Sequence, residues 1–155
     1  MSQITILLLY LLAAGAFTAS RLPRFGNLAR SLLAIAVILV ATGITLHGHT
    51  LVGLIHLSEG IHLTVGNAIS LIGFELAVIG LVAAIEPTLR GISGGLIFLA
   101  SLTALLMGPS ADVSMPVALT WQIRAHILIA LSSYGLLTVG TIVGLYALVQ
   151  ERRLQ

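Results

Sequence analysis

Uninterrupted apolar runs constrain this chain more than any other feature. Leu, Ile, Val and Ala dominate five successive stretches, near residues 4–19, 28–46, 68–85, 94–107 and 127–149. A helix that crosses a hydrocarbon core of about 30 Å needs roughly 20 predominantly apolar residues. Since 58% of the chain is hydrophobic and 8% is charged, the sequence predicts an all-α, polytopic membrane helical bundle.

The connections divide the chain into about five transmembrane helices. We expect these helices near residues 3–20, 28–47, 67–86, 93–108 and 125–150. The segment 51–65 is too polar and interrupted for a clean span, so we expect a short interfacial helix across the outer mouth of the bundle. At 155 residues, the chain 1–155 is predicted to form a single transmembrane domain without a second soluble domain.

Positive charge is distributed unevenly around these runs. All arginines except Arg124 fall in connections or ends expected on one side, namely Arg21, Arg24, Arg30, Arg90, Arg152 and Arg153. The positive-inside rule places them in the cytoplasm and the amino terminus outside, as in a bacterial inner (cytoplasmic) membrane protein. No positive charge precedes the first run, which favours a retained helix over a cleaved signal peptide. Because the net charge is only +2 and the arginines flank helices, nucleic-acid binding is not predicted.

The histidines are all expected on the opposite, outer side. They are His47, His49, His56, His62 and His126. Imidazoles gathered on one side of a helical bundle suggest haem, metal or proton chemistry there. His47 directly continues the second helix and is more apt than His49 to face inward. Because Gly48 lies between them, a solvated helix end is the simpler account of both.

Two further patterns bear on metal and enzyme chemistry. His56, Glu59 and His62 are spaced by three residues, which puts the two histidines about 120° apart on a helix. A metal site needs tighter convergence, so a polar stripe on an interfacial helix is the simpler account. The absence of cysteine excludes disulfides, iron–sulfur clusters and covalently attached c-type haem. Nucleotide-hydrolase, serine-hydrolase and zincin motifs are absent too, so we predict no catalytic residues and no enzymatic activity of the chain by itself.

The fifth run carries a stripe of positions that share one helix face at about 100° per residue. Its members are His126, Ala130, Ser133, Leu137, Gly140 and Gly144. Glycines four residues apart let another helix approach closely, so we expect Gly140 and Gly144 to serve helix packing. His126 would then face the bundle interior at the outer mouth. An axial haem ligand and an interfacial histidine bonded to a loop both remain open for it.

Glu75 is the one acid placed well inside a predicted span. It would be unfavourable against lipid, so we expect it to face the interior, with Ser70 or Ser101 as a polar neighbour. A proton relay and a neutral glutamic acid that hydrogen-bonds between helices are both compatible with this position.

Two segments of the chain resemble a known family. Residues 126–134 (HILIALSSY) and 150–154 (QERRL) resemble the cytochrome c assembly family, especially the YpjD/HemX-like branch of CcsA/CcmC-type haem-handling membrane proteins. Residues 60–71 (GIHLTVGNAISL) are similar to the segment that enters the third span in that family. The resemblance covers most of this chain and corresponds to the front part of such proteins. It implies that His126 is one of two external axial ligands to haem b, and His62 matches one motif variant.

The chain also departs from that family. It contains one tryptophan, no Trp-x-Trp-Asp loop and no later helix with a second external histidine. The partner ligand of His126 would therefore come from a longer protein, from a neighbouring subunit, or from within the chain. The candidates within the chain are His47, His49, His56 and His62.

Three functions follow as hypotheses. The first is an inner-membrane protein of cytochrome c assembly type that binds or presents b-type haem at the periplasmic face. The second is a non-catalytic accessory subunit that packs against a larger membrane complex through a face such as Gly140 and Gly144. The third is a bis-histidine, cytochrome b-like membrane anchor that pairs His47 with His126. The expected partners are the lipid bilayer and other membrane protein subunits.

Overall fold

The computed structural model describes residues 3–57, 60–61, 64–108 and 120–154. The main helices are α1 (Gln3–Ala19), α2 (Ala29–Ile55), α3 (Val65–Ala83), α4 (Arg90–Thr103) and α5 (Trp121–Leu154). Short 3-10 helices precede α2 and follow α4, as η1 (Pro23–Leu28) and η2 (Ala104–Leu106). The predicted all-α helical bundle is confirmed.

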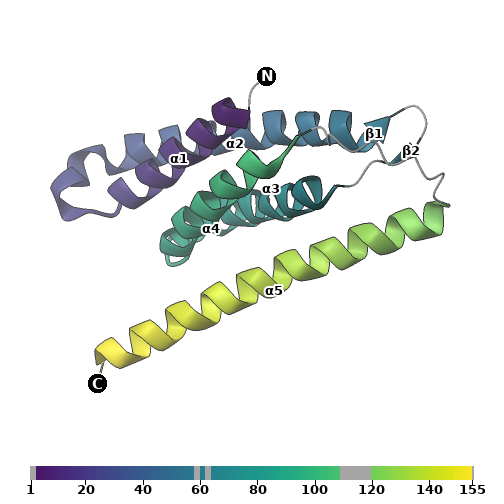
Figure 1. The fold of residues 1–155 in the computed structure, drawn as a ribbon. Helices are drawn as coiled ribbons and strands as arrows, with labels where there is room; N and C mark the ends of the chain where they lie inside the picture. The colour runs from purple at the N-terminus through teal and green to yellow at the C-terminus, as the bar shows by residue number, and fades with distance from the viewer. Residues whose placement is uncertain (1–2, 58–59, 62–63, 109–119, 155) are drawn as a thin grey trace.

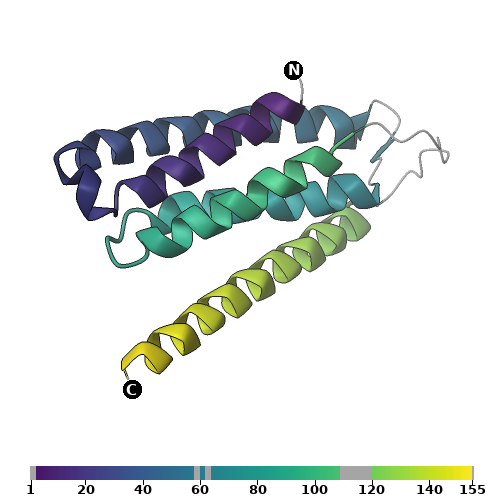
Figure 2. The same cartoon turned by 60° about the vertical axis from the view of Figure 1, so that its left-hand side comes forward.

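Four of the helices form one bundle, and the fifth lies beside it. α1 packs along α2 and α4, and α4 packs along α3 (Figure 1). α5 contacts mainly α3 and stands apart from α1 and α2 (Figure 2). The α1–α2 connection, the α3–α4 connection and the carboxyl terminus lie at one end, which we name the arginine end.

The helices have the length and composition of a membrane protein. Among the described residues, three helices are long and apolar enough to cross a bilayer, namely Pro23–Gly53, Val65–Ala83 and Trp121–Val149. α1 and the segment Arg90–Leu106 are shorter apolar helices. Large hydrophobic side chains such as Ile38, Val82 and Leu137 are exposed on the outer surface, where lipid would cover them. The chain is therefore a membrane protein.

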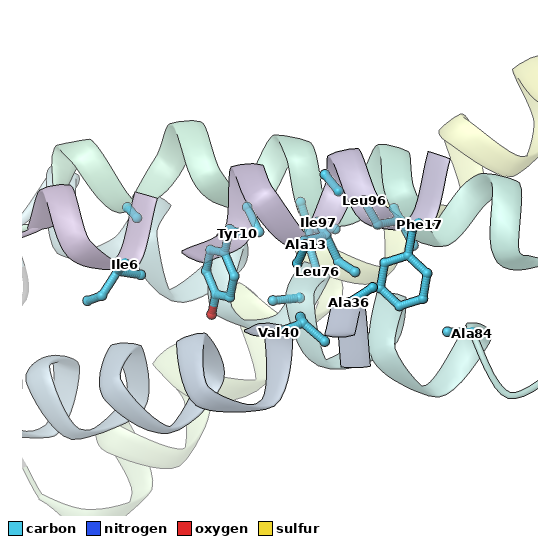
Figure 3. Close-up of a cluster of buried hydrophobic side chains, with 14 of the residues drawn as sticks. Ile6, Tyr10, Ala13, Phe17, Ala36, Val40, Leu76, Ala84, Leu96 and Ile97 are labelled. Carbon is cyan, nitrogen blue, oxygen red and sulfur yellow. The ribbon is translucent and has the colours of Figure 1, made fainter. Parts of the chain in front are cut away.

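The core of the bundle lies between α1, α2 and α4. One face of α1 is fully buried through Ile6, Tyr10, Ala13 and Phe17, which recur every three or four residues (Figure 3). The residues packed around them from the other helices include Ala36, Val40, Leu96 and Ile97. Because alanines alternate with the large side chains, the helix backbones approach closely. Membrane helices pack in this way although their outer faces are apolar as well.

Glycines on one face of α3 bring α4 close. A Cβ atom at Gly73 would overlap the Thr103 side chain, and one at Gly80 would lie 3.0 Å from Ile97 Cγ1. These two glycines are one heptad apart and so share a helix face. Close approach through small residues is the usual way in which membrane helices associate.

The structure corrects the prediction for residues 47–65. α2 continues through Gly48 to Ile55, so a separate interfacial helix over 51–65 is wrong. A two-residue strand pair follows, in which β1 (His56–Leu57) is antiparallel to β2 (Gly60–Ile61). Gly48 does not end α2 because backbone groups away from water stay hydrogen-bonded within a helix. Its missing side chain leaves room for Phe74, whose Cε2 would lie 3.0 Å from a Cβ there.

Several helix ends differ from the predicted ones by a few residues. α3 begins at Val65 because the Thr64 hydroxyl accepts a hydrogen bond of 3.0 Å from the Asn67 amide, as an N-cap. α3 ends at Ala83, three residues before the expected end at position 86. α4 begins at position 90 instead of 93, and α5 at position 121 instead of 125.

Candidate functional site

His47 lies at the centre of a hydrogen-bonded cluster that joins three helices. Its side chain is 0% exposed. The Nδ1 atom lies 3.2 Å from the Tyr10 hydroxyl of α1, and Nε2 lies 2.8 Å from the Ser70 hydroxyl of α3. The Phe74 ring stands edge-on to the imidazole, with 5.8 Å between ring centroids. We name Tyr10, His47 and Ser70 the buried polar cluster.

The cluster satisfies both nitrogens of a neutral imidazole, which needs one acceptor and one donor. In one tautomer Tyr10 donates to Nδ1 and Nε2–H donates to Ser70. In the other, Nδ1–H donates to Tyr10 and Ser70 donates to Nε2. The two hydroxyl partners are therefore compatible with either neutral tautomer of His47. The arrangement also means that His47 must lose one of its hydrogen bonds before it can bind iron.

The expectation that His47 sits at a solvated helix end is wrong. The residue lies eight positions before Ile55, about 12 Å inside the end of α2 at roughly 1.5 Å per residue. Tyr10 had no predicted role, and Ser70 was expected only as a partner of Glu75. A lone tyrosine in the middle of an apolar helix was the available signal, because a buried hydroxyl needs a partner.

Gly43 positions the tyrosine. It lies one turn before His47 on the same face of α2, and a Cβ atom there would be 2.6 Å from Tyr10 Cε1. The Tyr10 ring therefore crosses α2 at Gly43, and its hydroxyl points toward α2 (Figure 3). The hydroxyl lies within hydrogen-bonding distance of His47.

His126 is in the opposite situation. It lies in the second turn of α5, at the end of the bundle away from the arginine end (Figure 1), and its side chain is exposed. Within the described part of the chain, the imidazole has no hydrogen-bond partner. Neither ring nitrogen is engaged by a described residue. His49 is exposed too, on the last turns of α2.

The stripe that begins at His126 does not face the bundle, which corrects the prediction. Ser133, Leu137, Gly140 and Gly144 are exposed, and a Cβ atom at either glycine would meet open space. The contacts of α5 with the bundle come from the opposite face, through Ser132, Gly135, Val139, Ile142 and Tyr146. The two faces are about 180° apart at about 100° per residue. Both are apolar, so periodicity did not distinguish them.

The exposed stripe of α5 includes an open surface lined by residues of this one helix, namely Ser133, Leu136, Leu137, Gly140 and Thr141. Ser133, the lining residue nearest to His126 in the chain, lies seven positions after it, about 10 Å along the helix at roughly 1.5 Å per residue. The surface and the His126 imidazole are therefore separate features of α5. α5 carries no other histidine, so a second axial ligand to a haem on His126 would have to come from another element.

Glu75 links α3 to α5. The Ser132 hydroxyl donates a 2.6 Å hydrogen bond to Glu75 Oε1. Its other oxygen packs against the backbone of Gly135, where a Cβ atom would collide with Oε2. The expected partners are otherwise engaged, because Ser70 bonds His47 and Ser101 donates to the Phe98 carbonyl. Glu75 therefore hydrogen-bonds to α5 through Ser132, and not to Ser70 or Ser101.

The structure does not describe some of the predicted site residues. Glu59 and His62 lie outside the described residues, and His56 is described only as part of β1. Within the described ranges, no group of three or more His, Asp or Glu side chains is arranged to hold a metal ion. No family model, curated protein or solved structure matches this chain.

Proposed function

We propose that this chain belongs to an inner-membrane protein of the cytochrome c assembly type, which binds or presents b-type haem at the periplasmic face. The observation that carries the proposal is His126, an exposed imidazole with no partner among the described residues. The arginine end would lie in the cytoplasm, by the positive-inside rule, and His126 would lie at the outer face. The amino terminus would be outside.

His126 is a better ligand candidate than His47 for a physical reason. Iron needs a free lone pair on an imidazole nitrogen. His47 has both nitrogens within hydrogen-bonding distance of hydroxyl groups, whereas His126 has neither engaged by a described residue. His47 would then serve to hold α1, α2 and α3 together.

Haem would supply iron for axial coordination, and His126 would supply one axial ligand. His49 or His62, or a histidine of a neighbouring subunit, would provide the second ligand.

A reduced-minus-oxidised visible spectrum with a pyridine haemochrome assay tests this function. The protein would be purified in detergent from its native membrane. We expect a b-type signal that His126→Ala abolishes, because α5 carries no other histidine that could replace this ligand. His47→Ala should lower thermal stability but retain absorbance. Full Soret absorbance in His126→Ala would refute the ligand assignment.

A second function is favoured by the uncovered face of α5. Gly140 and Gly144 lie on it with open space above both, which suits close packing against a helix of another subunit. In that case the protein is a non-catalytic accessory subunit. It would be colourless and would co-migrate with a larger complex, and Gly140→Leu would release it. A colourless monomer from native membranes would contradict both functions.

The bis-histidine anchor has less support. It would use His47 as an axial ligand, and His47 would have to exchange a buried hydrogen bond for iron coordination. Absorbance lost in His47→Ala as completely as in His126→Ala would favour this function instead.

A further inference from the structure

A basic cleft opens at the arginine end of the bundle. It has a volume of about 260 Å³ and is lined by three arginines, Arg21, Arg30 and Arg90, together with Ser20 and Leu33. The arginines come from three places in the chain: the turn after α1, the second residue of α2 and the first residue of α4. The fold therefore brings Arg90 to the same cleft as Arg21 and Arg30, although Arg90 follows both of them by 60 or more residues in the chain.

The arginines of this basic cleft have few protein partners. Arg90 donates through Nε to the Ala84 carbonyl at 3.1 Å, and Arg21 lies against Gly91 near the Tyr146 hydroxyl. Among the described residues, none of the three guanidinium groups is in an ion pair with a carboxylate. The acid nearest in the chain, Glu86, accepts from the Thr88 hydroxyl at 3.3 Å.

Helix geometry adds to the positive potential. α4 begins at the basic cleft with Arg90, whereas α2 continues there from η1, and the Ala29 amide donates to the Gly26 carbonyl. Leu89, the residue before α4, makes no side-chain hydrogen bond to the first amide groups of α4. Helix amino termini carry partial positive charge and favour anions such as phosphate. Three convergent arginines repel one another unless an anion lies between them.

We propose that the basic cleft binds a phosphate group, and its position favours the headgroup of an anionic phospholipid as the source. Guanidinium groups match phosphate oxygens with paired hydrogen bonds. The basic cleft lies where α1 and α3 end and where α2 and α4 begin, at the level expected for headgroups. Leu33, one turn further along α2, would meet the start of an acyl chain. The proposal does not depend on haem binding.

Native mass spectrometry of the full chain in detergent tests the proposal, with phosphatidylglycerol as the anionic probe and phosphatidylcholine, which is zwitterionic and has no net charge, as the comparison. We expect phosphatidylglycerol to bind more tightly. Arg30→Gln and Arg21→Gln should each weaken it roughly fivefold, since one basic residue at a membrane surface contributes about that factor. Both side chains are exposed, so the fold should persist.

Arg24→Gln is the matched control. Arg24 lies at the same end, with its guanidinium 4.7 Å above the Phe25 ring, and does not line the basic cleft. Equal loss in Arg24→Gln, or equal binding of the two lipids, would overturn the proposal in favour of general surface charge. A second measurement adds inorganic phosphate to the protein with phosphatidylglycerol bound. If millimolar phosphate displaces the lipid, the basic cleft is assigned to free phosphate. If the lipid stays bound, the cleft is assigned to the lipid headgroup.

Discussion

The Tyr10 hydroxyl lies 3.2 Å from Nδ1 of His47, so α1 and α2 share a polar contact in the buried centre of the bundle. Ser70 extends it to α3 at 2.8 Å. Unpaired polar groups are strongly unfavourable in an apolar interior. These hydrogen bonds therefore fix how the three helices rotate about their axes, which apolar contacts alone leave less defined.

Tyr10→Phe removes the hydroxyl and leaves Nδ1 of His47 without its partner. We expect the free energy of unfolding to fall by about 1 kcal/mol, the usual size of a hydrogen bond between membrane helices. Thermal unfolding in detergent, followed by circular dichroism, measures the change. Tyr134→Phe is the control because Tyr134 is 62% exposed. Equal stability of the two variants would contradict a structural role for the buried polar cluster.

Gly43→Ala places a methyl group where Cε1 of Tyr10 would be 2.6 Å away. The ring must shift, so we expect destabilisation by about 1–3 kcal/mol, as for overpacked cores. Gly53→Ala lies in the same helix with nothing within 4 Å and should be neutral or stabilising. The prediction is wrong if both variants unfold at the same temperature as the unchanged protein.

Glu75→Leu removes the hydrogen bond that holds α5 to α3, whereas Glu75→Gln keeps an acceptor for Ser132. We expect α5 to separate from α3 in the first variant only. Because the chain has no cysteine, spin labels at Val78→Cys and Leu145→Cys report the distance cleanly. Both positions are exposed. A broadened distance distribution in Glu75→Gln as well would show that the charge, and not the hydrogen bond, matters.

Gly135→Ala and Gly140→Ala separate the two faces of α5. A Cβ atom at Gly135 collides with Oε2 of Glu75, so we expect weaker docking of α5 and a lower unfolding temperature. Gly140→Ala meets open space and should stabilise the isolated chain by about 0.5–1 kcal/mol, through helix propensity. Stability measured on both variants checks this, and the reverse ranking would mean that Gly140 faces the bundle.

The elements were largely predictable from sequence, while their exact ends and one connection were not. Long apolar runs place five helices, because no other secondary structure satisfies the backbone of such segments in lipid except a closed barrel. The predicted end of the second helix near position 47 was wrong because a glycine between two histidines is typical of a helix end. The actual place of Gly48 opposite Phe74 depends on α3, which is distant in sequence.

The candidate site was predictable only in part. His126 and Glu75 stand out because polar groups are rare in apolar helices. The sequence did not predict the surroundings of these two residues. Glu75 accepts a hydrogen bond from Ser132, and the face of α5 that carries His126 is turned away from the bundle.

The sequence by itself determined a membrane protein of apolar helices, with six of the seven arginines gathered at one end and the histidines toward the other. Composition and run length are enough for that, because partitioning into lipid depends on each segment alone. Only the tertiary structure decided which face of α5 is buried, which hydroxyls meet His47, and which arginines form the basic cleft. Lipid and protein interior are equally apolar, so hydrophobicity does not select a packing face. Close approach at small residues and pairing of the few polar groups make that selection instead.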